Sequence, residues 1–329
     1  PTELLELINI SLKPKKIEKK KFGEVFTPMR IVNEMLDKLD DHHQQEHGHS
    51  IFKEKDFKWL DPASGMGNFP IAVYWKLMEG LKSQISVKEE RKRYILEKML
   101  YMAEFNKKNV FISKQIFDIE NKYELNIFQG DSLKLDTEKE WGVKKFAVVM
   151  GNPPYNKPLT RSGATAFYNE FVDKFIDKCK YQTFIIPSRW FAGGKGLNKF
   201  RKNMLKRKDI VYIQHFNDAS KIFGNSVDIK GGVNYYLKSI EYHGDCNYNG
   251  NMIKLDSFDI LVDSKFYSLI YKLNKLPDIS KLYNGRYFGI ESNDKRLTTE
   301  ADLNSYRCYV SKQKGFTKKI DKKYLKKDY

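Results

Sequence analysis

The segment Asn152-Pro153-Pro154-Tyr155 places two hydrogen-bond acceptors beside an aromatic ring, directly after an apolar run at 146–150. Proline cannot continue a central strand, and a residue that precedes proline is held in an extended conformation. The side-chain oxygen of Asn152 and the carbonyl oxygen of Pro153 are therefore fixed close together, and Tyr155 offers a flat apolar surface. This combination suits a planar exocyclic amine. Taken alone, the four residues are also compatible with a proline-rich turn after a buried strand.

Four polar side chains in all follow predicted strands. Asp61 follows residues 57–60, Glu104 follows 95–103, Asp131 follows 125–130 and Asn152 follows 146–150. A single acid at such a position often caps the next helix, so the prediction depends on the ordered set. Because the carboxyl ends of parallel strands meet at one edge of a sheet, we expect these four side chains to line one ligand site.

The loop at 61–69 reads Asp-Pro-Ala-Ser-Gly-Met-Gly-Asn-Phe and precedes an apolar helix at 71–78. Gly65 and Gly67 allow a tight turn and a close approach of the backbone to a ligand. The loop lacks the third glycine of a dinucleotide-binding turn and carries the acid Asp61 instead. An acid favours an amine-bearing or cationic ligand over a phosphate. We therefore interpret this loop as the first strand-to-helix turn of a doubly wound sheet.

The segment Phe26-Thr27-Pro28 predicts a helix start, with Thr27 as N-cap, Pro28 as first helical residue and apolar residues at helical spacing over 31–39. Alternating strands and helices continue to about residue 242. Beyond it the pattern changes to short strands, turns and scattered tyrosines, which indicates a second module.

The chain carries 59 Lys and Arg against 42 Asp and Glu, a net charge of +17. This excess favours a polyanion partner, and the many Tyr and Phe residues supply stacking surfaces that nucleic-acid binders use. A coding bias toward Lys, Asn and Tyr would give a similar composition. The basic segment 195–208 predicts a surface helix that faces phosphates.

Three features argue against other classes. We find no apolar run of membrane-spanning length and no signal-peptide core, so we expect an intracellular, cytoplasmic protein without a membrane partner. The three cysteines, Cys179, Cys246 and Cys308, are far apart and indicate neither disulfides nor a zinc site. Residues 40–50 hold four of the six histidines, but no usual ligand spacing completes a metal site, so we predict an exposed loop and no metal.

Phe26-Thr27-Pro28, the loop at 61–69 and Asn152-Pro153-Pro154-Tyr155, in this order, resemble the N6-adenine DNA methyltransferases of the gamma arrangement. The resemblance covers roughly residues 20–240, and segments 185–188 and 231–233 resemble restriction-modification methyltransferases of bacteria, phages and large DNA viruses. It implies an α/β, Rossmann-like, S-adenosylmethionine-dependent methyltransferase fold with a mostly parallel sheet. Residues 1–242 would form the catalytic domain and 243–329 the start of a smaller, incomplete DNA target-recognition domain.

The resemblance also implies roles for individual residues. Asp61 and the loop 65–67 would hold the amino-acid part of S-adenosylmethionine, Glu104 its ribose hydroxyls and Asp131 its adenine amine. The implied cofactor-binding set is Phe26, Thr27, Pro28, Asp61, Ala63, Gly65, Gly67, Asn68, Glu104, Asp131 and Ser132. The implied catalytic set is Asn152, Pro153, Pro154 and Tyr155, and the implied DNA contacts are Phe223 at the target base and Lys195, Arg201 and Lys202. Phe223 is also compatible with a core position.

The expected activity is methyl transfer from S-adenosylmethionine to N6 of a flipped-out adenine in a specific sequence of double-stranded DNA. Methyltransferases that act on protein glutamine or on guanine N2 of ribosomal RNA share the tetrapeptide, but the Phe-Thr-Pro segment and the aromatic-rich region after 240 favour DNA. Two alternatives are the methyltransferase module of a bifunctional restriction-modification enzyme and a non-enzymatic recognition subunit. The segment before Phe26 is too short for a nuclease domain, so we expect methylation without cleavage.

Overall fold

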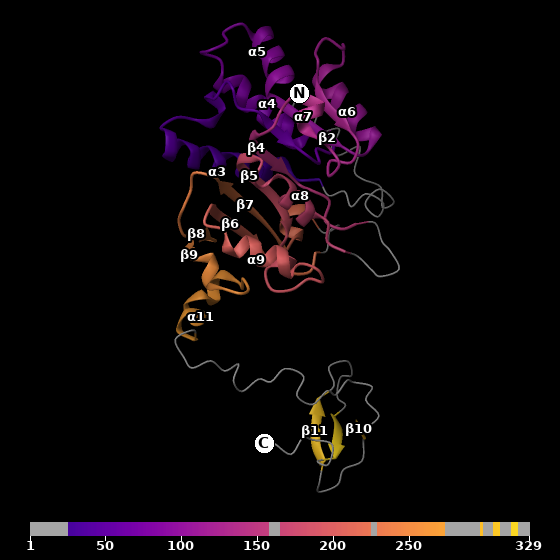
Figure 1. The fold of residues 1–329 in the computed structure, drawn as a ribbon, viewed down its shortest axis with the longest axis vertical. Coiled ribbons are helices and arrows are strands. Elements are labelled where there is room, and N and C mark those ends of the chain that lie inside the picture. Colours follow the sequence, from indigo (N-terminus) through magenta and orange to yellow (C-terminus); the bar gives the residue numbers. More distant parts are fainter. Residues whose placement is uncertain are drawn as a thin grey trace. The chain divides into compact units, whose positions relative to one another are not determined.

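A sheet of nine strands in the order β3-β2-β1-β4-β5-β7-β6-β8-β9 forms the centre of the larger unit (Figure 1). The computed structural model describes residues 26–157, 165–224, 229–273, 297–298, 305–309 and 317–321. The strands are β1 (Trp59–Asp61), β2 (Leu100–Glu104), β3 (Asn126–Gln129), β4 (Phe146–Gly151), β5 (Cys179–Pro187), β6 (Ile210–Phe216), β7 (Val233–Ser239), β8 (Cys246–Tyr248) and β9 (Asn251–Ile253).

Strand β1 lies at the point where the strand order reverses direction. It pairs in parallel with β2 on one side and β4 on the other. Strands β3 and β5 continue the parallel pairing outward, whereas β7 inserts antiparallel between β5 and β6. In open α/β sheets, ligands bind outside the carboxyl ends of the strands at this reversal point. The topology therefore directs attention to the residues that follow β1 and β4.

Helices cover both faces of the sheet. They are α3 (Met29–His47), α4 (Asn68–Gly80), α5 (Lys88–Tyr94), α6 (Lys107–Asp118), α7 (Thr137–Trp141), α8 (Tyr168–Phe175), α9 (Asn198–Lys206) and α10 (Ser220–Phe223). Short helical turns lie at Ile51–Lys53, Ile95–Met99, Ser188–Trp190, Leu255–Ser257 and Ser264–Phe266.

Alternate residues of β5 show how the two layers are separated. Tyr181 and Ile185 share one core cluster with the apolar stripes of α3 and α4. Successive side chains of a strand point to opposite faces, so Gln182 faces the other layer, where its amide donates to the carbonyl of Val172 in α8. Ring contacts of Phe200 with Tyr168 and Trp190 join α9 to that second layer.

The chain divides into two compact units, Pro1–Lys265 and Phe266–Tyr329. The second unit contains α11 (Tyr267–Leu273) and an antiparallel sheet of β10 (Leu297–Thr298), β12 (Thr317–Asp321) and β11 (Ser305–Tyr309), in that order. In the first unit, β8 joins the main sheet by pairing with β6, so the sheet extends beyond residue 242. That residues 243–329 recognise a DNA target stays a prediction.

The structure corrects the exposed loop predicted for residues 40–50. Helix α3 continues to His47 and ends at Gly48, which has a left-handed conformation and donates its N–H to the carbonyl of Gln44. His42 and His43 are buried on the same side as Leu39, because positions three and four residues apart share a helix face. The polar composition of residues 40–47 gave no indication of a helix, because buried histidines take the place of apolar residues on its buried face.

Two predicted boundaries also shift. The N-cap of α3 is Pro28, and the Thr27 side chain makes no capping hydrogen bond. Residues 95–103 were predicted as one strand, but Ile95–Met99 form a π-helical turn and β2 begins only at Leu100.

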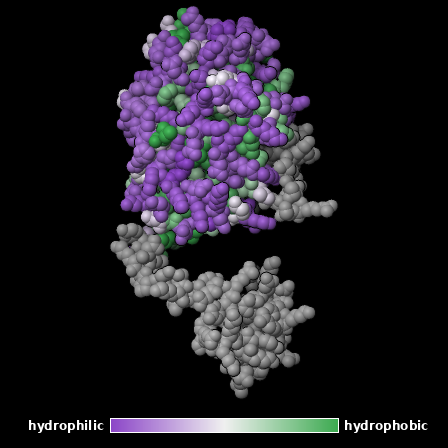
Figure 2. All heavy atoms as spheres, in the orientation of Figure 1, coloured by the Kyte–Doolittle hydropathy of each residue, from purple (hydrophilic) through white to green (hydrophobic). Residues whose placement is uncertain are grey.

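One face of the described residues is mainly polar. Hydrophilic residues predominate on the face drawn in Figure 2, and hydrophobic residues are scattered among them. None of the helices among the described residues combines the length and apolar character needed to cross a bilayer.

Adjacent glycines before β7 provide a test of the packing. A Cβ on Gly232 would lie 2.0 Å from the carbonyl oxygen of Phe216, whereas one on Gly231 would meet nothing within 4 Å, and both residues have positive φ. We expect Gly231→Ala to lower the free energy of unfolding by about 1–2 kcal/mol, the cost of the left-handed backbone. Gly232→Ala should lose about 1–3 kcal/mol more, since a neighbouring backbone must move. Urea unfolding of both variants measures the difference, and equal losses would contradict this packing.

Candidate active site

The four polar residues that follow strands β1 to β4 line one cavity of about 520 Å³. Asp61 ends β1 and Glu104 ends β2, while Asp131 and Asn152 lie one or two residues beyond β3 and β4. The structure thus brings together the set that the strand ends predicted. A cavity of this size is typical of a small-molecule or cofactor site.

The ends of β1 and β4 lie in close contact. Gly151, with φ of +145°, is placed so that a Cβ on it would lie 2.6 Å from the Asp61 carboxylate. Only glycine allows this conformation and this approach. Gly151 therefore lets the two strand ends present Asp61 and Asn152 to the same cavity.

Asp61 is 1% exposed, and its carboxylate oxygen accepts the N–H of Ala63 at 3.0 Å. Burial raises the pKa of Asp61 to about 8 from an ordinary 3.8, and the nearby charge of Glu104 adds to this effect. The charged carboxylate is therefore destabilised in the protein alone. A cationic or amine-bearing ligand would restore the charged form.

The glycine loop is held by the end of the neighbouring strand. The two carboxylate oxygens of Glu104 accept the N–H of Gly65 at 2.8 Å and the N–H of Asn106 at 2.6 Å. Gly65 and Gly67 have φ of +54° and +96°, and the Phe26 ring lies 3.6 Å from the position of a Cβ on Gly65. The loop thus passes under an aromatic ring without a side chain between them.

The Phe-Thr-Pro segment closes one side of the cavity. Phe26 and Thr27 are lining residues, and the Asn68 side-chain amide donates to the carbonyl oxygen of Thr27 at 2.9 Å. Since Thr27 does not cap α3, its hydroxyl is available to the cavity. Ala63, Gly65, Asn68 and Ser132 also line it, whereas Pro28 and Gly67 support it from outside the lining.

Three buried oxygen atoms on lining residues have no hydrogen-bond partner among the described residues. They are Thr27 Oγ1, Ser64 Oγ and Asn68 Oδ1. Buried polar atoms are normally satisfied, so unsatisfied ones at a cavity wall indicate where a ligand donates or accepts hydrogen bonds. The sequence analysis included Thr27 and Asn68 in the site and missed Ser64.

Aromatic residues that the sequence analysis missed form much of the wall. Phe69, Phe105, Phe167 and Phe171 all line the cavity. The helical spacing of Phe167 and Phe171 in the sequence indicated an amphipathic helix, and that pattern alone does not distinguish core from cavity wall. Phe105 is 62% exposed. Its position directly after Glu104, at the end of β2, could have predicted that it lines the cavity.

The first three residues of the tetrapeptide line the cavity, but its tyrosine does not. Asn152, Pro153 and Pro154 line the cavity, whereas Tyr155 is 5% exposed and packs edge-on against the Phe223 ring at 6.4 Å. Burial raises the pKa of Tyr155 above its ordinary value, which keeps the hydroxyl neutral. The structure therefore joins Tyr155 of the predicted catalytic set to Phe223, the residue predicted at the target base.

The predicted phosphate contacts differ in their surroundings. Lys195 and Lys202 are exposed. The guanidinium of Arg201 donates to the carbonyls of Trp190 and Gly193 and to the Asn198 side chain. Arg201 therefore has a structural role whether or not it contacts DNA.

Residues 82–223 match the family model described as Eco57I restriction-modification methylase. This match includes Glu104, Asp131, the tetrapeptide and Phe223. It confirms the expected resemblance to methyltransferases of the restriction-modification type.

Particular relatives agree with this class. The chain is 26% identical over 344 residues to an uncharacterized adenine-specific methylase of Mycoplasma pneumoniae, covering 82% of this chain and 80% of that protein. It matches the modification subunit of a putative type I restriction enzyme from Vibrio vulnificus with a TM-score of 0.53 and 15% identity, over 84% of this chain and 57% of that one. It matches DrdV, solved with DNA, with a TM-score of 0.54 and 18% identity, over 78% of this chain and 31% of that one.

These structural matches confirm the Rossmann-like methyltransferase fold expected from the sequence. The chain spans about 57% of the Vibrio subunit and 31% of DrdV, so both solved chains are longer than this one.

The buried carboxyl of Asp61 gives a prediction for stability without ligand. Its pKa in the folded protein, about 8, exceeds the ordinary 3.8, so between these pH values the folded state binds more protons than the unfolded state. Stability falls as pH rises through this window. We expect Asp61→Asn to raise the urea midpoint at pH 8 and to match the wild-type midpoint near pH 4. Asp245→Asn, at an exposed position, is the control, and a constant offset at all pH values would contradict the account.

Proposed function

We propose that this protein transfers a methyl group from S-adenosylmethionine to N6 of adenine in double-stranded DNA. The observation that carries the proposal is the common cavity of Asp61, Glu104 and Asn152, which combines cofactor-type acids with acceptors for an exocyclic amine. The name of the Mycoplasma relative agrees with adenine as the target.

The donor set fits S-adenosylmethionine. Asp61 is suited to the ammonium end, Glu104 and Asp131 to the ribose hydroxyls and the adenine amine, and the aromatic wall to the apolar surfaces. The unsatisfied oxygens of Thr27, Ser64 and Asn68 add further partners. When bound, S-adenosylmethionine supplies a methyl group activated by a positively charged sulfur.

The tetrapeptide prepares the target amine. The Asn152 side-chain oxygen and the Pro153 carbonyl accept the two N6 hydrogens of adenine, so that the nitrogen becomes tetrahedral and directs its lone pair at the methyl carbon. As the N–C bond forms and the S–C bond breaks, positive charge develops on N6, and the two oxygens stabilise it. The methylated amine then loses a proton to water.

The target base must leave the duplex before it reaches these acceptors. In this proposal the extruded adenine stacks against Tyr155, which follows the acceptors directly in the chain and packs edge-on against Phe223. Because Tyr155 is buried and its hydroxyl stays neutral, we propose that it supports the base by packing and does not act as a general acid.

Basic residues on the surface position the phosphates. The net charge of +17 and the exposed side chains of Lys195 and Lys202 support binding to a polyanion. DrdV and LlaBIII, both matched in fold, have been solved with DNA. A protein glutamine or an RNA base would offer the tetrapeptide similar chemistry, but neither is supported by a relative's name.

Substitution of Asn152 tests the chemical step. We expect Asn152→Ala to lower kcat for methyl transfer to DNA roughly 10²- to 10³-fold, since one acceptor for the developing charge is lost. Binding of S-adenosylmethionine, measured by calorimetry, should stay within about threefold of the wild type. Asn33→Ala, on the exposed side of α3, is the matched control. Full activity of Asn152→Ala would exclude this role.

Substitution of the exposed lysines tests the DNA contacts. The double variant Lys195→Ala/Lys202→Ala should reduce the slope of log affinity against log salt by about 2 and leave cofactor binding unchanged. A second double variant, Lys82→Ala/Lys139→Ala, removes the same charge from exposed sites elsewhere. Equal slopes for the two double variants would show that the contacts lie on another surface.

A further inference from the structure

The histidines at the end of α3 form a cluster far from the candidate active site. Helix α3 begins two residues after Thr27 and runs for 19 residues to His47. At 1.5 Å per residue, its two ends lie about 28 Å apart. Any role of this cluster is therefore separate from binding at the cavity.

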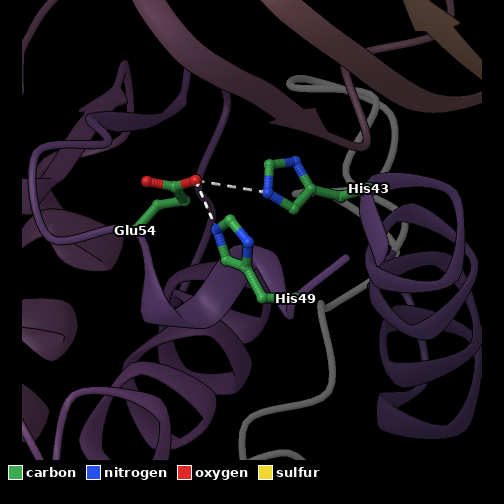
Figure 3. Close-up of side chains that lie close together, drawn as sticks. All are labelled: His43, His49 and Glu54. Atoms are coloured by element: carbon green, nitrogen blue, oxygen red, sulfur yellow. Dashed lines mark hydrogen bonds and ion pairs between the residues drawn. The ribbon is translucent and has the colours of Figure 1, made fainter. Parts of the chain in front are cut away.

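Two imidazoles converge on one carboxylate oxygen (Figure 3). His43 Nε2 lies 3.4 Å from Glu54 Oε1, and His49 Nε2 lies 2.8 Å from the same oxygen. The three ligand atoms lie within 4.8 Å of one another. His43 comes from α3, while His49 and Glu54 flank the helical turn Ile51–Lys53.

The other ring nitrogen of each histidine has a partner of its own. His49 Nδ1 lies 3.0 Å from the carbonyl oxygen of His47, which can only accept, so Nδ1 carries a proton. Nε2 faces the Glu54 carboxylate, which also accepts, so a metal ion would bind there by displacing the Nε2 proton. His43 Nδ1 lies 3.0 Å from the Tyr181 hydroxyl of β5. Histidines that bind metals usually have their second nitrogen hydrogen-bonded in this way.

His43 is fully buried, and its Nε2 has no hydrogen-bond partner among the described residues. Buried polar atoms normally have a partner. A cation between the three atoms would supply one for His43 Nε2.

We propose that His43 Nε2, His49 Nε2 and Glu54 Oε1 bind one divalent transition-metal ion of the zinc type. Two imidazoles and a carboxylate favour such an ion over Mg²⁺ or Ca²⁺, which prefer oxygen ligands. Bond lengths near 2.0–2.2 Å require the ligand atoms to lie roughly 3.3 Å from one another in a tetrahedron. The side chains of His49 and Glu54, 43% and 30% exposed, can rotate to do so and admit water as fourth ligand.

This ion would fasten the segment before β1 to the end of α3 and, through Tyr181, to β5. The neighbouring group of Glu46, His47 and Glu241 is a poorer metal site, because the ammonium group of Lys180 already lies against it. The Lys180 ammonium lies 2.9 Å from Glu241 and 3.1 Å from His47 Nε2.

Calorimetric titration with ZnCl₂ tests the proposal, using full-length protein without a histidine tag and freed of metal by a chelator. We expect one tightly bound ion per chain in the wild type and at least a 100-fold loss of affinity in His49→Ala and Glu54→Gln. Tyr181→Phe, which removes the hydroxyl beside His43 together with its contacts to Glu46 and His47, should lose about 10-fold. Glu241→Gln, in the neighbouring group, should bind like the wild type.

His49, Glu54 and Glu241 are at exposed or partly exposed positions, whereas Tyr181 is buried. Circular dichroism and melting without metal establish that each variant is folded. Zinc should raise the melting temperature of the wild type and of Glu241→Gln but not of His49→Ala. The proposal is wrong if the wild type binds no ion, if folded His49→Ala and Glu54→Gln bind as the wild type does, or if Glu241→Gln is the variant that loses the ion. Methyl transfer is a separate measurement, so either result leaves the proposed function untouched.

Discussion

The contact between the ends of β1 and β4 is the constraint on which the site depends. Gly151 passes so close to the buried carboxyl of Asp61 that no side chain fits between them. This approach brings the residue after β4, Asn152, into the cavity that Asp61 occupies at the reversal point of the sheet. The Asp61 carboxyl and the Asn152 amide can line one cavity only because a glycine ends β4.

Burial of the Asp61 carboxyl at this contact makes the charged form of Asp61 unfavourable in the protein without ligand. A carboxyl buried at this point favours its neutral form, and the Glu104 carboxylate that holds the glycine loop raises the Asp61 pKa further. The protein alone therefore carries a site that is costly to charge, and a cationic ligand removes that cost. In the account proposed here, binding of S-adenosylmethionine would both stabilise the fold and complete the site.

The sequence predicted the parts of this site that depend on local order. Apolar runs that end in Asp61, Glu104, Asp131 and Asn152 identify strand ends, and parallel topology collects them at one edge. Tertiary neighbours decided the rest. Tyr155 packs edge-on against Phe223, and the Thr27 side chain does not cap α3. Helix α3 continues to His47, and its buried His43 contacts Tyr181. Polar composition alone could not reveal those contacts.

The most direct test of the central claim is nucleoside mass spectrometry of DNA incubated with the purified protein and S-adenosylmethionine carrying a labelled methyl group. The account predicts label in N6-methyladenine and its absence when Asn152 is replaced by alanine. Label in another base, or none in DNA while RNA or protein is labelled, would contradict it.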